Sequence, residues 1–217
     1  SNFTDLSARW QVFSRGHGLV CKSYKGEPNL ETIAANAQAA QGAVKTLLQF
    51  IGEDITRDGL LDTPGRVVKA WQEMTAGYSQ NPEEILGRVF EQEYDEMIIL
   101  KKIQFYSTCE HHLLPFYGEA SVGYLPGKVV GISKLARLVE CFAKRLQIQE
   151  RLTQQIASAV LKHLDAKGVG VSIQAHHLCM GCRGVKQQSS QMVTNIMLGQ
   201  LRNDDKARNE FLLAIRG

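Results

Sequence analysis

The stretch VGVSIQAHHLC, residues 169–179, alternates apolar side chains with small or polar ones. Successive side chains of a strand point to opposite faces of a sheet, so this pattern predicts a half-buried strand. His177 and Cys179 belong to the apolar set, whereas His176 belongs to the other set. His177 is therefore either a core histidine or a functional one, and in both cases a buried imidazole needs a polar partner.

A second cluster, Cys109-Glu110-His111-His112, follows a segment rich in β-forming residues, 97–106. Cys109 and His112 are three residues apart, so one turn can present both to one ion, and Cys179 can complete the set. Catalytic zinc sites have three protein ligands and keep one position for water, whereas structural sites have four. The pattern predicts a hydrolytic zinc site, with His111 and His177 beside it for proton transfer.

Other interpretations of these residues stay open from the pattern alone. A free cysteine often packs as a small buried hydrophobic residue, so the pair Cys109 and His112 need not bind metal. Cys179 can also be a core residue at the end of a strand. Cys182 lies three residues further on and can act as the fourth ligand of a closed structural site.

The rest of the chain divides into a polar arm, a helical region and a mixed region. We expect a flexible N-terminal arm over 1–28, helices over 29–95 and the catalytic domain over 96–217. Asn29, Thr63-Pro64 and Asn81-Pro82 are typical helix starts. In the last region we expect strands over 97–106, 119–125 and 129–130, a helix capped by Ser133, a helix over 150–167 stopped by Gly168, and the strand over 169–179. This order predicts an α+β fold with an antiparallel sheet.

Composition limits the function classes. The chain has 217 residues, a net charge of +3 and five scattered cysteines, an odd number that does not suggest a disulfide framework. No apolar run approaches the length of a membrane span, and no block of lysine and arginine suggests a nucleic-acid surface. We expect a soluble cytoplasmic protein that binds neither nucleic acid nor membrane.

Five motifs together resemble GTP cyclohydrolase I. They are TPGRVVK (63–69), STCEHH (107–112), GISKLAR (131–137), QIQERLT (147–153) and HLCMGCRG (177–184). The resemblance implies a tunnelling fold, with two helices packed on one face of the antiparallel sheet and further helices before it. It also implies conversion of GTP to 7,8-dihydroneopterin triphosphate and formate, the first step of pterin and tetrahydrofolate biosynthesis. The implied assembly is a homodecamer of two pentamers, with sites shared between subunits.

The resemblance also implies a role for each site residue. Cys109, His112 and Cys179 would hold one zinc ion per subunit. His177 would protonate the imidazole-ring nitrogen of guanine as C8 is attacked, and His111 would transfer protons during ribose opening. Glu150, with Gln149 alongside, would recognise guanine. The triphosphate would be bound by Arg66, Lys69, Ser133, Lys134, Arg137 and Arg183. The alternative is a non-catalytic zinc- or pterin-binding relative of the same fold.

Overall fold

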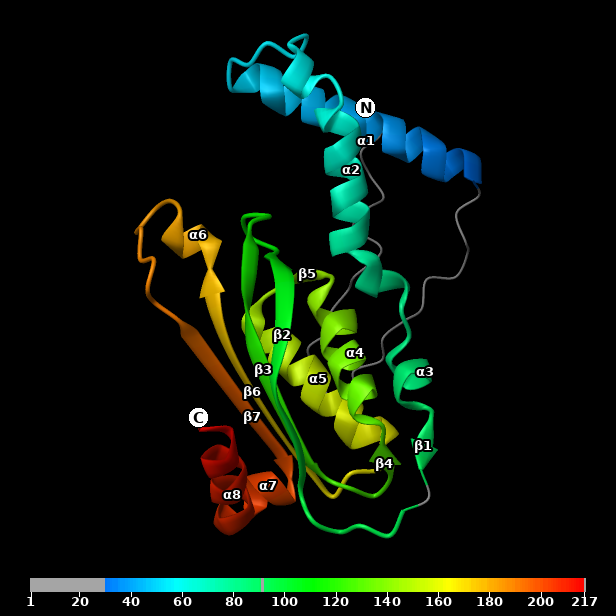
Figure 1. Cartoon of the computed structure of the whole chain (residues 1–217), viewed down its shortest axis with the longest axis vertical. Coiled ribbons are helices and arrows are strands. Elements are labelled where there is room, and N and C mark those ends of the chain that lie inside the picture. Colours follow the sequence, from blue (N-terminus) through cyan, green and yellow to red (C-terminus); the bar gives the residue numbers. More distant parts are fainter. Residues whose placement is uncertain (1–29, 91, 217) are drawn as a thin grey trace, which may run out of the picture. The chain divides into compact units, whose positions relative to one another are not determined.

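The computed structural model describes residues 30–90 and 92–216 (Figure 1), so the expected arm over 1–28 lies outside the described residues. The described residues fall into two compact units, one that ends at Val68 and one that begins at Lys69. No helix of the described part is long and apolar enough to cross a bilayer.

The first unit contains α1 (Leu30–Phe50), the short 3-10 helix η2 (Asp58–Leu60) and the start of α2 (Thr63–Met74). The predicted helix starts near residues 29 and 63 are confirmed. Several large apolar side chains are exposed within this unit, among them Leu47, Phe50 and Ile51. Exposed apolar side chains of this size in a cluster are typical of a surface that contacts another chain.

The second unit is built on a five-stranded sheet with the strand order β5-β2-β3-β6-β7. Its strands are β2 (Ile98–Cys109), β3 (Pro115–Leu125), β5 (Leu146–Gln147), β6 (Gly168–His177) and β7 (Met192–Gly199). All neighbouring strands are antiparallel except β2 and β5, which pair in parallel. The predicted antiparallel sheet is confirmed.

Two helices, α4 (Ile132–Ala143) and α5 (Gln149–His163), cover one face of this sheet (Figure 1). The apolar set of β6 faces them, and Val171, Ile173 and Leu152 are fully buried in the shared core. Burial of these side chains is the main force that holds the helices on the sheet. The predicted pair of helices on one face is therefore confirmed.

Smaller elements frame the sheet. The 3-10 helix η3 (Ala76–Ser79) and α3 (Pro82–Leu86) pack beside α4, and β1 (Val89–Phe90) pairs with β4 (Val129–Val130). Asn81 caps α3 as predicted, because its side chain accepts a 3.0 Å hydrogen bond from Glu83 N.

The C-terminal helices α7 (Gln200–Asn203) and α8 (Asp205–Ile215) cover one end of the opposite face of the sheet. The ring of Phe211 packs on Gly123 of β3 and Gly170 of β6. A Cβ at Gly123 would lie 2.6 Å from this ring, and a Cβ at Gly170 would lie 2.9 Å from it. The two glycines are therefore required for the close approach of α8.

Three predicted boundaries are wrong. Ser133 does not cap α4, because the helix begins at Ile132 after Gly131, which makes no side-chain cap. The helix predicted to reach residue 167 ends at His163, and Gly168 opens β6 instead of stopping that helix. The strand predicted over 169–179 ends at residue 177, where the chain enters the one-turn helix α6 (Leu178–Gly181).

Candidate metal centre and active site

The first half of the candidate metal centre is a tight turn at the end of β2. Cys109 N donates to Leu114 O, and Leu113 N donates to Cys109 O, both at 2.8 Å. Leu113 has a φ of +55°, which is uncommon for a residue with a side chain and closes the turn. The turn brings His112 back over the strand end, so that its Nδ1 lies 3.8 Å from Cys109 Sγ.

Cys179 reaches this turn from α6. The register of β3 and β6 pairs Phe116 with His177, so the end of β6 lies beside the segment that follows the turn. The candidate ligand atoms of Cys109, His112 and Cys179 all lie within 4.8 Å of one another. Two sulfurs and one imidazole nitrogen are the donors that zinc prefers.

The fourth-ligand alternative gains no support from the described geometry. Cys182 is an exposed free cysteine, and it is not part of the three-residue cluster. Burial and the neighbouring Cys109 thiol raise the pKa of Cys179, because two thiolates in one place repel each other. A divalent cation among these three donors reverses that penalty, since metal ligation favours the thiolates.

His177 lies beside the cluster, on the helix side of the sheet. Its ring stacks on Phe116 with a centroid distance of 4.6 Å and an interplanar angle of 3°. Its Nε2 lies 2.9 Å from Gln149 Oε1. Burial lowers the pKa of His177, and the nearby Glu150 carboxylate offsets part of that shift. The neutral imidazole is therefore favoured near neutral pH.

Gln149 fixes which nitrogen of His177 carries the hydrogen. The Gln149 side chain is 1% exposed, and its amide nitrogen lies 3.0–3.1 Å from three acceptors: Ile173 O, Met192 O and Thr194 Oγ1. Because the NH₂ group is committed to these acceptors, the amide oxygen accepts from His177 Nε2–H. His177 Nδ1 is then the atom left to exchange a proton. The contact of Gln149 with guanine stays a prediction.

Glu150 and Arg151 follow directly in the first turn of α5. Glu150 is exposed, so its carboxylate is accessible to a ligand. Arg151 forms a bidentate ion pair with Glu110 of the turn over 109–114, called the metal turn below. The Nη2–Oε1 distance of this pair is 3.0 Å, and the contact lowers the pKa of Glu110. His111 is exposed, with its Nε2 3.9 Å from Glu110 Oε1. Sequence reasoning gave no role to Glu110 or Arg151, although both lie inside quoted motifs.

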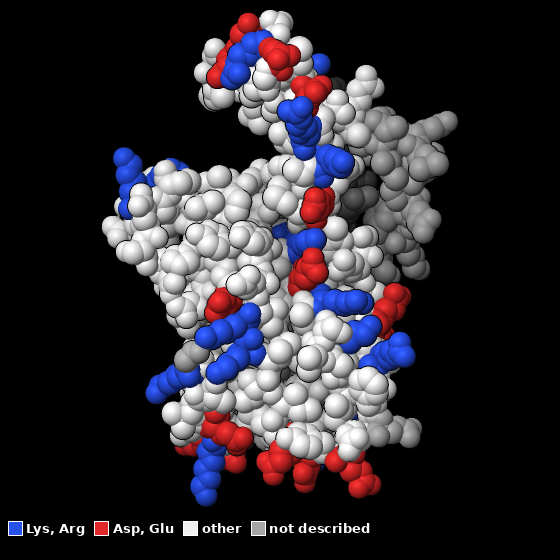
Figure 2. Space-filling view, viewed as in Figure 1, with Lys and Arg blue, Asp and Glu red and all other residues white. Residues whose placement is uncertain are grey.

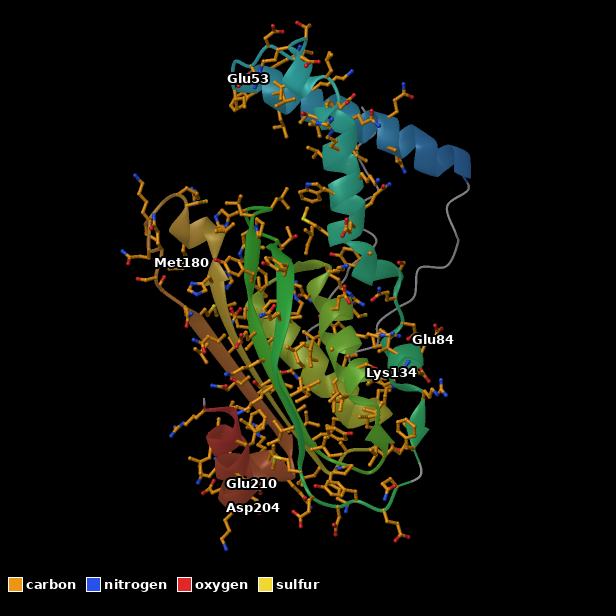
Figure 3. All side chains as sticks on the ribbon, in the orientation of Figure 1. Glu53, Glu84, Lys134, Met180, Asp204 and Glu210 are labelled. Atoms are coloured by element: carbon orange, nitrogen blue, oxygen red, sulfur yellow. The ribbon has the colours of Figure 1, made fainter. Side chains whose placement is uncertain are left out.

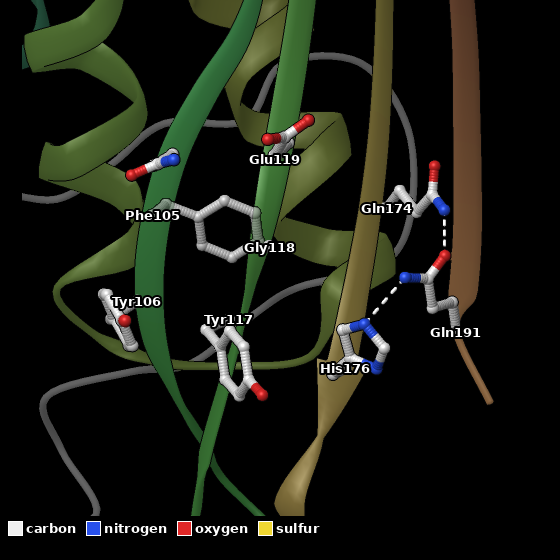
Figure 4. Close-up of a pocket in the computed structure, with 9 residues that line it drawn as sticks. Phe105, Tyr106, Tyr117, Gly118, Glu119, Gln174, His176 and Gln191 are labelled. Carbon is white, nitrogen blue, oxygen red and sulfur yellow. Dashed lines mark hydrogen bonds between the residues drawn. The ribbon is translucent and has the colours of Figure 1, made fainter. Parts of the chain in front are cut away.

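His176 lies on the opposite face of the sheet from His177, as the alternation predicts. Its ring stacks with Tyr117 at 5.7 Å, and Tyr117 stacks with Tyr106 at 5.5 Å. Gln191 shares a 2.6 Å hydrogen bond with His176 (Figure 4). These residues line a shallow cleft of about 470 Å³ that the sheet separates from the metal cluster.

The basic residues assigned to the triphosphate lie on separate elements of the chain. Electrostatic contact with Cys179 places Arg183 close to the metal cluster. Ser133, Lys134 and Arg137 instead follow β4, whose Val130 is hydrogen-bonded to Tyr124. Tyr124 pairs with Ile98 at the start of β2, whereas Cys109 is the last residue of the same strand. From its start, α4 runs back toward Cys109, because Leu146, three residues after the helix ends, pairs with Thr108.

Lys134 and Arg137 line a second cleft, of about 550 Å³, with Glu84 and Glu140. Figure 3 shows Lys134 beside Glu84. On the face seen in Figure 2, basic and acidic side chains of the described residues alternate rather than form one basic surface. Lys69 is the first residue of the second unit, and Arg66, in the first unit, pairs with Asp62 at 3.2 Å.

Comparison with known proteins agrees with this geometry. The family model described as GTP cyclohydrolase I matches residues 40–216. A protein of Wolinella succinogenes named "GTP cyclohydrolase 1" is 54% identical over 180 residues, which are 82% of this chain and 96% of that protein. A Coxiella burnetii protein of the same name is 57% identical over 175 residues, 80% of this chain and 95% of its own length.

Among solved structures, an archaeosine synthase QueF-like protein in the apo form matches 50% of this chain and 97% of its own, with a TM-score of 0.41 and 18% identity. The antiparallel sheet with α4 and α5 on one face is a tunnelling fold. With the family model matching most of the chain and relatives more than 50% identical over nearly their whole length, this chain belongs to the GTP cyclohydrolase I family.

Proposed function

We propose that this protein uses zinc to convert GTP and water to 7,8-dihydroneopterin triphosphate and formate. The observation that carries the proposal is the convergence of Cys109, His112 and Cys179 within 4.8 Å, next to His177. The donor set suits zinc and has three protein ligands, as catalytic zinc sites do. A bound zinc would supply a water with its pKa lowered to about 7, which makes hydroxide available at neutral pH.

Guanine recognition is assigned to Glu150. Its exposed carboxylate lies close enough to His177 to shift the pKa of that imidazole, so it borders the same space. One carboxylate accepts hydrogen bonds from both N1–H and the 2-amino group of guanine. Adenine offers no such pair of donors, so Glu150 selects GTP over ATP.

The two histidines transfer protons at different stages. His177, held through Nε2–H by Gln149, would take up a proton at Nδ1 and pass it to the imidazole-ring nitrogen of guanine as C8 is attacked. His111 is exposed on the metal turn and serves the later proton transfers that open the ribose. Both roles suit imidazole, whose unperturbed pKa is about 6.5.

We further propose that the working site is shared between subunits of a homodecamer made of two pentamers. Ser133 and Lys134 lie in the first turn of α4, whereas Cys109 lies beside β5, which follows the other end of that helix, so we assign their phosphate contacts to another copy. The exposed apolar side chains of α1 are consistent with an assembly. A cytoplasmic location is consistent with the free thiols of Cys109, Cys179 and Cys182.

The test is metal analysis combined with product identification. The purified protein should hold about one zinc per chain, and GTP should yield equimolar formate and a pterin triphosphate. A non-catalytic relative would bind zinc or a pterin and release no formate. A metal-free protein with full activity would remove zinc from the proposal.

A further inference from the structure

The Glu110–Arg151 ion pair differs from the other ion pairs of the described residues. The two residues are 41 positions apart, and both terminal nitrogens of the guanidinium group contact the carboxylate. The Glu110 side chain is only 29% exposed and the Arg151 side chain 33%. Four of the other pairs between carboxylates and lysine or arginine join residues three or four apart, and the Lys128–Asp165 pair is at least half exposed. Exposed pairs contribute little, whereas bidentate arginine–carboxylate pairs are stronger and fix geometry.

We propose that Glu110 and Arg151 act as positioning residues that hold the metal turn against the first turn of α5. The inference rests on the proposed function of this site. Glu110 lies between the candidate ligands Cys109 and His112, and its side chain reaches across to α5. The backbone of the turn is already tied to β5, because Glu110 N donates to Gln147 O at 3.0 Å.

The first turn of α5 thereby supports the whole site with three consecutive residues. Gln149 holds His177, Glu150 faces the proposed guanine position, and Arg151 holds the metal turn. Successive helix residues point about 100° apart, so one helix end can serve three directions at once. The distance from the metal to the guanine carboxylate is then set by this helix end. Misplacement of a reacting group by about 1 Å can cost roughly a hundredfold in rate.

Glu110→Gln tests the positioning role of the Glu110–Arg151 pair with a nearly isosteric change. The amide loses the negative charge and one acceptor, and its NH₂ group faces the donors of Arg151. Because partners that orient metal ligands typically contribute 10- to 100-fold to metal affinity or activity, we expect kcat to fall by roughly that factor. KM for GTP should change little, since neither residue contacts GTP in the proposal. Zinc should also leave the variant faster when a chelator is added.

The Co(II)-substituted protein gives a readout that does not depend on turnover. Its visible absorption reports the geometry of the ligands, so Glu110→Gln should change the bands while the protein still binds one Co(II) per chain. Arg151→Lys, which keeps the charge but cannot contact both carboxylate oxygens, should give the same change in weaker form. In the Glu110→Gln/Arg151→Gln double variant the losses should not multiply, because the two residues act as one unit.

Asp165→Asn is the matched control, because it makes the same chemical change in the long-range Lys128–Asp165 pair at the other end of the sheet. It should leave kcat, zinc release and the Co(II) spectrum as in the parent protein. The proposed positioning role is refuted if Glu110→Gln has the same Co(II) spectrum and the same rate of zinc release as the parent protein. It is also refuted if the activity of Glu110→Gln falls only in proportion to the folded fraction. Absence of metal binding or formate release in the parent protein would instead refute the proposed function.

Discussion

Replacing His177 and His176 in turn gives the sharpest test of the site, because the neighbours lie on opposite faces of one strand. His177→Ala removes the proposed proton donor, which should lower kcat by roughly 10²–10⁴-fold. It also leaves Gln149 Oε1 unpaired in a buried position and removes the stack on Phe116. Those two losses should lower the free energy of unfolding by about 2–4 kcal/mol.

His176→Ala should behave differently. It removes a stack with Tyr117 and a hydrogen bond with Gln191 on the exposed face, so stability should fall by under about 1 kcal/mol. Turnover should stay close to that of the parent protein.

The two variants are distinguished by three measurements made at one protein concentration: formate release, zinc content and thermal unfolding. Both variants should keep their zinc, since neither histidine is a proposed ligand. The reasoning is refuted if the two variants lose turnover equally, or if His176 proves to be the critical residue. Loss of zinc in the His177 variant would show that its role is ligation rather than proton transfer.

Four further outcomes are expected. Cys179→Ser should lose zinc and activity together, whereas Cys182→Ser should keep both in metal analysis and formate assays. Glu150→Gln should lower kcat/KM for GTP by roughly ten- to a hundredfold without changing the thermal unfolding midpoint, because a charged acceptor for guanine is lost. Gly123→Ala should lower the free energy of unfolding by about 1–3 kcal/mol in denaturant titrations, because its Cβ would lie 2.6 Å from an aromatic ring of α8. Burial and the neighbouring lysine lower the pKa of His163, so the unfolded chain binds the proton more readily; stability should fall as pH drops below about 6.5, and less steeply in His163→Gln.

The alternation in β6 shows how far a local pattern reaches. It correctly separates His176 from His177, because a regular strand fixes the face of each side chain. It wrongly extends the strand to Cys179, which approaches the metal turn from α6. The backbone hydrogen bond from Cys182 N to Leu178 O closes the helical turn of α6. The alternating sequence is compatible with a strand and with this turn, so it does not show where the strand ends. The ligand set predicted from the motifs is nevertheless the set that the structure brings together.

The C-terminal elements were missed for a different reason. β7 is an edge strand that carries apolar residues on both faces, with Ile196 and Leu198 on one and Val193 and Met197 on the other, so its sequence shows no clean alternation. α8 is held by Phe211, whose position depends on two glycines in strands far away in the sequence. The Glu110–Arg151 pair is likewise a contact across 41 residues. Such contacts are set by the tertiary fold, and the single sequence carries no local signal for them.

The placement of the motifs on separate elements is also the reason why we propose a site shared between subunits. The 107–112 motif ends β2, whereas the 131–137 motif forms the start of α4, a 12-residue helix whose far end leads into β5 beside Thr108. At about 1.5 Å per residue this helix is roughly 18 Å long. If both motifs serve one GTP, we expect the basic residues of α4 to come from another subunit, placed so that the start of its α4 meets the metal turn of the first. A shared site of this kind makes activity depend on assembly, so dilution that dissociates the oligomer should abolish turnover while each chain keeps its zinc.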